Sequence, residues 1–353
     1  MNNMAAEINI GDRKVGLNTP CYMIAEIGVN HNGDIELAKK MISAAKSCGA
    51  DAVKFQTFTA ERLVTQGTPK VRYQEDTTSA EESHYDMIKK LELNEEGHVI
   101  LKKYCASVGI EFISTPYDIE SARFLNELGV SVFKTASADI VDLPLHHYLA
   151  ETGKPVIVAT GMATMDEVES VVDVYNDAKN YSVALLHCVS NYPCSNKSLN
   201  LRVIGTLQST FDKVLGFSDH TSGETASVMA VTLGAKIIEK HFTLDKTLPG
   251  PDHKASADPD EFRKLVVSVR FAEEALGSPL KQCQDEEKQM ALVSRKSIVM
   301  KIPVRMGERL TREHFTLKRP GTGLMAKEIP GIIGKTTRRD LPANHVLAWN
   351  DFE

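Results

Sequence analysis

Short apolar runs alternate with amphipathic segments along the first three-quarters of the chain. Many of these runs are continuously apolar rather than alternating, which is typical of strands covered on both faces. The eight candidate strands are 21–29, 52–58, 111–116, 132–137, 155–160, 183–189, 213–218 and 236–242. Eight strand-then-helix units in succession predict a closed parallel (β/α)₈ (TIM) barrel of the α/β class, with an open doubly wound sheet as the alternative.

The amphipathic segments carry recognisable helix ends. Asp34 is a predicted N-cap, and Gly49 is predicted to end the same helix. Thr164 and Glu167 have the spacing of a capping box. A longer helical pattern covers residues 259–277. These ends separate the helices from the strands that precede them.

Two segments interrupt or follow this alternation. Residues 59–92, called here the excursion, are too long for a simple connection, and we interpret them as a polar excursion over the barrel mouth. Residues 278–293 are polar and lack a strand pattern, which indicates a linker between a barrel domain (1–277) and a C-terminal domain. Residues 294–353, rich in Gly, Pro and β-branched residues, predict a small domain of short strands and turns.

Composition narrows the class of protein. A length of 353 residues suits a barrel with an appendage, and a net charge of −6 argues against general binding to nucleic acid or anionic lipid. The six cysteines form no CxxC pair, which favours reduced thiols in a cytoplasmic protein. No signal-like segment or run of 18 apolar residues is present, so we expect no membrane association.

Polar residues gather where the predicted strands end, which is where barrel enzymes place their catalytic groups. They include Glu26, Lys54, Gln56, Thr115, Lys134, Ser137, Asp139, Ser190, Tyr192 and Ser218. A buried lysine requires an anionic partner. Lys54 and Lys134 are therefore either structural partners of carboxylates such as Glu26 and Glu239, or part of a cradle for a phosphate and a carboxylate.

Two histidines, His220 and His241, end the last two strands, which are neighbours in a closed barrel. Two imidazoles so placed can share one divalent ion and leave the remaining positions to water and substrate. His31, His187 and His253 are further candidates, so spacing alone does not select the pair.

Longer motifs carry a resemblance to a known family. They are AEIGVNHNG (25–33), VKFQTF (53–58), FISTP (112–116), GFSDHT (216–221), EKHFT (239–243), GPDHKAS (250–256) and LKRPGTG (317–323). Over nearly its whole length the chain resembles the bacterial sialic-acid (N-acetylneuraminate) synthases. These enzymes condense phosphoenolpyruvate with N-acetylmannosamine or a related N-acyl amino sugar, and carry a C-terminal antifreeze-like (SAF) domain.

The resemblance implies a role for each matching residue. His220 and His241 would bind Mn²⁺ or Mg²⁺, and Glu26, Lys54 and Lys134 would be catalytic. The residues that would bind phosphoenolpyruvate are Lys54, Thr115, Lys134, Ser137, Ser190 and Ser218. Those that would contact the sugar are Gln56, Asp139, Tyr192, Asp252 and, from the partner subunit of a domain-swapped homodimer, the arginine at position 319. The metal would polarise the sugar aldehyde, and phosphate would leave by C–O cleavage after water adds.

Three positions depart from the family's best-known pattern. Asp139 stands in place of a glutamate, Ala159 in place of a serine and Ser190 in place of an asparagine. Asp139 bears most on the sugar, because relatives of this type make legionaminic or pseudaminic acid from diacetamido-trideoxy sugars. The expected sugar is N-acetylmannosamine, with these deoxy sugars as the alternative.

Two other functions remain to be separated from a synthase. One is a barrel aldolase that forms a Schiff base with pyruvate through Lys54, Lys134 or Lys240. The other is a carbohydrate-binding protein with a vestigial barrel, against which the full set of lysines, histidines and Glu26 argues.

Overall fold

The computed structural model describes residues 6–75, 77–79 and 81–353. The chain divides into two compact units, Met1–Gly277 and Ser278–Glu353, which we describe separately. No helix in the described part of the chain is both long enough and apolar enough to cross a membrane.

Eight parallel strands form the centre of the first unit. They are β3 (Tyr22–Gly28), β4 (Ala52–Thr57), β5 (Glu111–Pro116), β6 (Phe133–Thr135), β7 (Val156–Ala159), β8 (Val183–Cys188), β9 (Val214–Asp219) and β10 (Ile237–His241). Their order is β5-β4-β3-β10-β9-β8-β7-β6, so the last strand pairs with the first. β5 and β6 lie in contact without a described ladder between them. The predicted barrel is therefore confirmed, in a nearly closed form.

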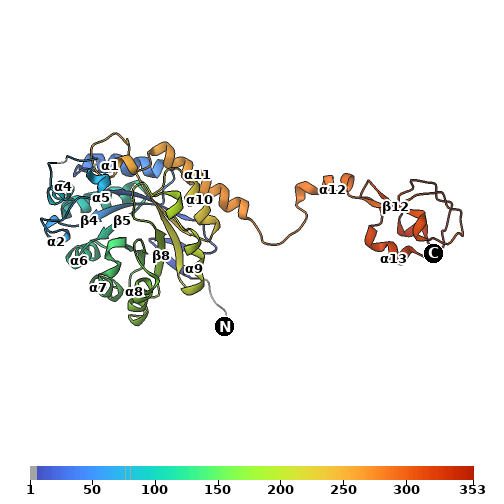
Figure 1. Ribbon diagram of the computed structural model, residues 1–353, viewed down its shortest axis with the longest axis horizontal. Coiled ribbons are helices and arrows are strands. Elements are labelled where there is room, and N and C mark those ends of the chain that lie inside the picture. The colour runs from blue at the N-terminus through green and yellow to red at the C-terminus, as the bar shows by residue number, and fades with distance from the viewer. Residues whose placement is uncertain (1–5, 76, 80) are drawn as a thin grey trace. The chain divides into compact units, whose positions relative to one another are not determined.

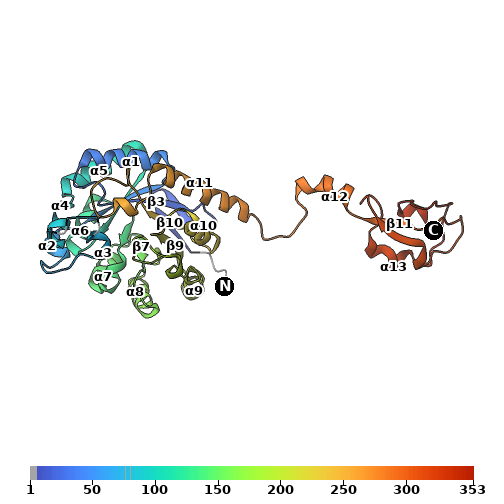
Figure 2. The same cartoon turned by 45° about the horizontal axis from the view of Figure 1, so that its top comes forward.

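A ring of helices surrounds the strands (Figure 1 and Figure 2). They are α1 (Ile35–Ser47), α5 (Glu95–Val108), α6 (Ile119–Leu128), α7 (Leu143–Glu151), α8 (Met165–Asp177), α9 (Arg202–Thr210), α10 (Thr225–Thr232) and α11 (Pro259–Leu276). The predicted cap of α1 is confirmed, because Asp34 accepts a hydrogen bond from the amide of Glu36 at 2.7 Å. The capping box of Thr164 and Glu167 at the start of α8 is confirmed too.

An N-terminal hairpin, which the sequence pattern did not predict, packs on the amino ends of the strands. Strands β1 (Glu7–Ile10) and β2 (Arg13–Gly16) pair antiparallel around a tight turn. Their buried side chains Ile8, Ile10 and Val15 join an apolar cluster formed by first residues of barrel strands. The hairpin therefore covers the end of the barrel opposite to the strand ends that carry the predicted site.

The excursion forms three short helices, α2 (Ala60–Leu63), α3 (Arg72–Glu75) and α4 (His84–Lys90). The side chains of Phe58, Met87 and Leu91 pack into a small apolar cluster beside the end of β3. The expectation of a polar excursion is therefore wrong for its inner surface, since only the outward-facing side chains are predominantly polar.

The second unit contains a helix, α12 (Lys288–Ser294), and a strand pair, β11 (Ser297–Met300) with β12 (Phe315–Lys318). Short helical turns and α13 (Ile329–Ile332) complete it. Its own apolar core includes Ile298, Met300 and Leu347. The expected small domain of short strands and turns is confirmed.

Candidate active site

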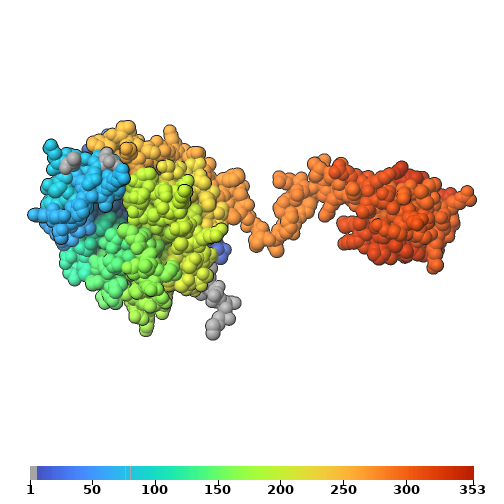
Figure 3. Space-filling model, viewed as in Figure 1, coloured from blue at the N-terminus to red at the C-terminus, as the bar shows by residue number. Residues whose placement is uncertain are grey.

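A cavity of about 510 Å³ lies at the carboxyl ends of the barrel strands. Twelve of the predicted site residues line it: Glu26, Lys54, Gln56, Thr115, Lys134, Ser137, Ser190, Tyr192, Ser218, His220, His241 and Asp252. In the space-filling view the blue excursion and the green-to-yellow second half of the barrel lie on either side of a hollow (Figure 3). These side chains come together because parallel strands bring their ends to one edge.

Two lysines and two glutamates form a buried row of alternating charge on the cavity floor. The Lys54 ammonium lies 2.9 Å from Glu26 and 4.0 Å from Glu239, and Lys134 lies 3.6 Å from Glu239. Lys54 also donates to the Thr115 hydroxyl at 3.0 Å. Pairing of this kind offsets the cost of burying each charge. The sequence analysis named Glu239 only as a possible partner of the lysines, and the structure places it beside both of them in the lining of the cavity.

The two lysines differ in their electrostatics. Burial disfavours the charged form of Lys54, but Glu239 and Glu26 outweigh this effect and raise its pKa. Burial lowers the pKa of Lys134, against the opposing attraction of Glu239. Lys240, the third lysine considered for Schiff-base chemistry, points away from this cavity into an ion pair with Asp219 at 3.0 Å. Lys54 is therefore a fixed cation, which suits binding an anion better than nucleophilic attack.

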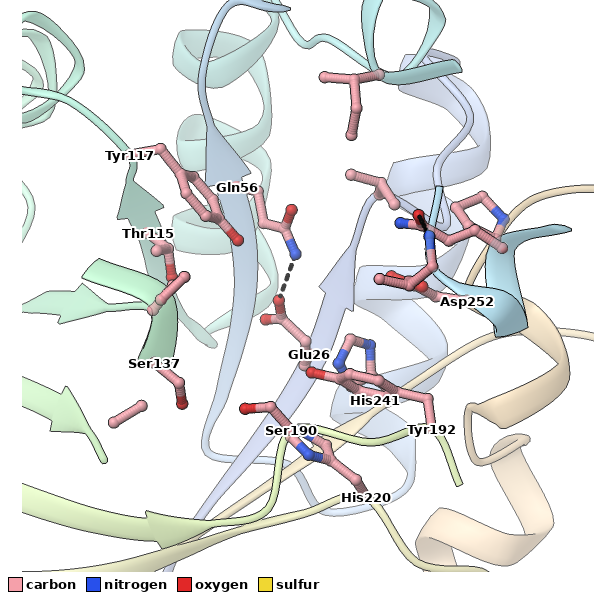
Figure 4. A pocket seen from close by; sticks show the side chains of 18 of the residues that line it. Glu26, Gln56, Thr115, Tyr117, Ser137, Ser190, Tyr192, His220, His241 and Asp252 are labelled. Carbon is pink, nitrogen blue, oxygen red and sulfur yellow. Dashed lines mark hydrogen bonds between the residues drawn. The ribbon is translucent and has the colours of Figure 1, made fainter. Parts of the chain in front are cut away.

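Glu26 occupies the centre of the cavity (Figure 4). Its pKa is raised to about 7, chiefly by burial, with Lys54 opposing and Glu239 reinforcing the shift. The Gln56 amide donates to Glu26 Oε1 at 3.3 Å, whereas Oε2 faces the Lys54 ammonium at 2.9 Å. A carboxyl group with a pKa near neutrality can accept and return a proton at the pH of the cell.

His220 and His241 lie side by side, with ring centroids 5.7 Å apart. The carbonyl of Val189 is 2.8 Å from His220 Nδ1, which fixes that ring and leaves Nε2, 3.4 Å from the Ser218 hydroxyl, as its candidate ligand atom. His241 Nδ1 is buried and has no described hydrogen-bond partner. Burial lowers the pKa of both rings, that of His241 to about 3 with the help of His220 and Lys54. Both imidazoles are therefore neutral, as a metal ligand must be.

This pair fits a divalent ion with open coordination positions. Among the described residues no group of three or more His, Cys, Asp or Glu side chains is arranged to hold a metal. The protein would therefore supply two ligands, the imidazoles of His220 and His241. The other candidates have structural partners: His31 accepts from the Gly33 amide at 3.0 Å, and His187 lies 2.7 Å from the Leu199 carbonyl. His253 lies 2.7 Å from the Thr243 hydroxyl. None of these three lines the cavity.

The aromatic ring of Tyr192 covers the histidine pair. It lies 4.2 Å from His220 and 5.4 Å from His241, centroid to centroid (Figure 4). The loop that carries Tyr192 is fixed to the next strand, because the Cys194 amide donates to the His220 carbonyl at 2.8 Å. This main-chain contact, two residues beyond Tyr192, helps to hold its ring against the imidazoles.

The upper wall of the cavity is largely apolar, although Arg72 and Gln74 of the excursion also line it. Its apolar side chains come from the end of β4 and from the excursion, and they are Phe58, Leu63, Val64, Val71, Met87, Ile88 and Leu91. Tyr117, Tyr73 and His84 add rings to the same lining. Sequence reasoning missed this wall, although the apolar residues within the excursion were a signal for it. The cavity therefore has a charged floor and an apolar upper wall.

One predicted site residue of the barrel unit, Asp139, does not line this cavity. Asp139 lies in the 3₁₀ turn Ser137–Val141, where Oδ2 is buried without a described hydrogen bond. Burial, reinforced by Asp142, raises its pKa to about 7. Arg319 belongs to the second unit, where it is exposed just after β12. Ala159 does line the cavity, at the end of β7.

Comparison with known proteins places the chain among sugar-acid synthases. Residues 41–281 match the NeuB family and residues 295–353 the SAF domain. The chain is 43% identical to N,N'-diacetyllegionaminic acid synthase of Legionella pneumophila, over 97% of this chain and 98% of the relative. It is 38% identical to human N-acetylneuraminate-9-phosphate synthase, over 92% and 90% of the two chains.

A solved structure agrees with these matches. The N-acetylneuraminic acid synthetase of Leptospira borgpetersenii superimposes with a TM-score of 0.72 at 36% identity, over 82% of this chain and 96% of that one. Most of the chain therefore has a counterpart in this solved structure, and nearly all of it in the Legionella relative. The chain belongs to the NeuB family and is an enzyme of the sialic or nonulosonic acid synthase type.

Proposed function

We propose that this protein condenses phosphoenolpyruvate with a diacetamido-trideoxy sugar of mannose type, giving a legionaminic-type acid and phosphate. The observation that carries the choice of sugar is the apolar upper wall over a charged floor. A sugar with a methyl group in place of a hydroxymethyl group, and with two acetamido groups, presents more apolar surface than N-acetylmannosamine does. Its burial against Leu63, Met87 and Leu91 is correspondingly more favourable.

The similarity to other synthases supports the same choice. The Legionella relative, named for diacetyllegionaminic acid, is more similar to this chain than the human relative, named for N-acetylneuraminate 9-phosphate. Asp139 also has a shorter side chain than the expected glutamate, and it does not line the cavity. A shorter side chain there leaves room for an acetamido group where a hydroxyl would otherwise be bound.

The charged floor suits phosphoenolpyruvate. Lys54, Lys134 and the hydroxyls of Thr115, Ser137, Ser190 and Ser218 offer donors for a phosphate and a carboxylate. In the proposed reaction the methylene carbon of phosphoenolpyruvate bonds to the sugar's aldehyde carbon, whose oxygen takes up a proton. Water adds to the phosphate-bearing carbon and releases a proton to Glu26. The carbon–oxygen bond to phosphate then breaks while the new hydroxyl becomes the ketone, and phosphate departs with the bridging oxygen and the proton of that hydroxyl.

His220 and His241 would hold a divalent ion, Mn²⁺ or Mg²⁺, beside the aldehyde. When bound, such an ion supplies Lewis-acid polarisation of the sugar carbonyl. The protein's own contribution is to keep both imidazoles neutral and oriented, through burial and the Val189 carbonyl. The Nδ1 atom of His241, which has no hydrogen-bond partner among the described residues, supports this assignment.

A panel of sugars tests the proposed substrate. We expect kcat/KM for the diacetamido-trideoxy mannose-type sugar to exceed that for N-acetylmannosamine by at least ~10-fold, because one buried methyl group is worth roughly 1 kcal/mol or more. Mass spectrometry of the nonulosonate product, with phosphate release, measures both reactions. A preference for N-acetylmannosamine would contradict the sugar assignment and leave the reaction type standing.

A change in the wall sharpens this test. Met87→Gln keeps the length of the side chain but places an amide on the apolar wall. The ratio of kcat/KM for the deoxy sugar to kcat/KM for N-acetylmannosamine should therefore decrease. Met290→Gln, at an exposed position of the second unit, is the matched control and should leave the preference unchanged. An unchanged preference in Met87→Gln would mean that the wall does not select the sugar.

We further propose that the second unit acts on the barrel of another copy of the chain, as a swapped homodimer. Charge complementarity supports this arrangement. Residues 278–353 contain 14 basic and nine acidic residues, whereas the whole chain contains 41 basic and 47 acidic residues. The remainder is therefore strongly acidic. Arg319, exposed after β12, would reach the acyl group of the partner's sugar.

Mixing two inactive variants tests the swap. Arg319→Ala and His241→Ala, unfolded together and refolded, should regain roughly a quarter of the wild-type activity, since half of the dimers are mixed and each has one intact site. Variants refolded separately and then assayed together at once are the control. If Arg319 served the barrel of its own chain, mixed dimers would contain no intact site and no activity would return.

A further inference from the structure

Tyr73 is a residue of the excursion to which neither the motifs nor the proposed chemistry gives a role. It lies in α3, a four-residue helix, and its side chain lines the active-site cavity. The ring is half-buried, and burial raises the pKa of its hydroxyl, with the neighbouring Asp252 carboxylate adding to the rise. A phenol in this setting remains protonated and can donate a hydrogen bond.

Tyr73 has two contacts with residues of the site. Its ring centroid is 5.2 Å from that of Tyr192, the ring that covers both histidines. Its hydroxyl is near the buried carboxylate of Asp252, which lines the same cavity. Burial raises the pKa of Asp252 to about 6, and Tyr73 opposes this rise. Tyr73 thus lies beside a residue on the histidine side of the cavity and a residue on its sugar side.

A second cavity lies behind these rings. It has a volume of about 240 Å³ and shares Tyr73, Tyr192 and Pro251 with the active-site cavity. The Thr77 hydroxyl donates to the Pro251 carbonyl at 3.3 Å, which ties the excursion to the loop after β10. Both tyrosine side chains therefore line both cavities, and they are called here the partition.

We propose that Tyr73 is a positioning residue that acts through Tyr192 and Asp252. Its ring supports Tyr192 against the histidine pair, and its hydroxyl orients the Asp252 carboxylate toward the sugar. The inference rests on the proposed function of the site, because the histidines must hold a metal and Asp252 must meet the sugar. Without the Tyr73 ring, Tyr192 has an empty cavity to move into and no longer restrains the two imidazoles.

Two substitutions separate the ring from the hydroxyl. Tyr73→Phe keeps the partition but loses the contact with Asp252. We expect it to raise the sugar KM at least ~5-fold while the Mn²⁺ dissociation constant stays within ~2-fold of wild type. Tyr73→Ala loses both contacts. We expect the same change in sugar KM together with Mn²⁺ binding weakened ~10-fold, the lower end for residues that orient metal ligands.

The measurements are titration calorimetry with Mn²⁺ alone and steady-state kinetics at saturating phosphoenolpyruvate. Tyr181→Ala, at a tyrosine with 65% exposure, is the matched control and should change neither quantity. If Tyr73→Ala binds Mn²⁺ and the sugar as the wild type does, the inference is wrong and the proposed function stands. If wild-type protein binds no Mn²⁺, the metal assignment itself fails, and with it the role of Tyr73 beside the histidines.

Discussion

Replacing His241 with alanine is expected to abolish Mn²⁺ binding and to lower kcat at least ~1000-fold, since Lewis-acid stabilisation contributes several kcal/mol to the transition state. The neutral ring lies 5.7 Å from that of His220, and the described residues offer no third ligand nearby that could compensate for its loss. The measurements are calorimetric titration with Mn²⁺ and phosphate release from phosphoenolpyruvate. Treatment with a chelator should reproduce the loss in wild-type protein, and added Mn²⁺ should reverse it.

A matched control is available for this substitution. His147→Ala changes an exposed histidine on α7 and should leave both Mn²⁺ binding and kcat within ~2-fold of wild type. His241→Ala protein must show native circular dichroism for its result to count. Turnover that survives both the substitution and the chelator would exclude the metal-dependent reaction. Trapping of a pyruvate adduct by borohydride would then identify a Schiff-base aldolase instead.

Lys54→Met is expected to damage both stability and catalysis. It leaves Glu26 and Glu239 as buried carboxylates without their shared cation. Such a change typically lowers the free energy of unfolding by about 3–5 kcal/mol. It also removes a cation from the proposed phosphoenolpyruvate cradle, so kcat/KM for that substrate should fall at least ~100-fold. Urea unfolding and steady-state kinetics measure the two effects.

The pH dependence of the stability loss identifies its cause. The pKa of Glu26 is already raised to about 7, and loss of Lys54 raises it further. The folded variant then binds a proton that the unfolded chain releases near its ordinary pKa of about 4.3, so its stability decreases as pH rises through this window. The deficit relative to wild type should be smaller at pH 6 than at pH 8. An equal deficit at both pH values would show that buried charge is not its cause.

A double variant separates the structural from the chemical role. Adding Glu26→Gln to Lys54→Met removes one unpaired carboxylate and should recover part of the stability without recovering activity. Lys40→Met, at an exposed position of α1, is the control and should change the unfolding free energy by less than ~0.5 kcal/mol. Recovery of activity in the double variant would mean that Lys54 serves only to neutralise Glu26.

The barrel could be predicted because its evidence is local and repeated. Each continuous apolar run became a strand, and caps such as Asp34 became helix ends. The polar residues at the strand ends came together for a geometric reason, since parallel strands end at one edge. The N-terminal hairpin was not predicted because its strands contain only four residues each, too few for a clear alternation.

The remainder of the site depends on contacts that a linear pattern does not contain. Spacing could not select the histidine pair from the other candidates, because the choice rests on which rings line the cavity of the folded chain. The apolar wall comes from helices of four to seven residues, which are too short to show a helical period. Tyr73 lies on one of them and meets Tyr192 only after both loops have folded.

The N-terminal hairpin bears on the order in which substrates bind and products leave. Ile8, Ile10 and Val15 close the barrel at its amino end, so the active-site cavity opens at the carboxyl end. On the proposed chemistry, the reactant that rests on Lys54 lies deeper than the one beneath the excursion. If both substrates enter through this opening, binding is ordered: phosphoenolpyruvate would bind before the sugar. The sugar acid would then dissociate before phosphate.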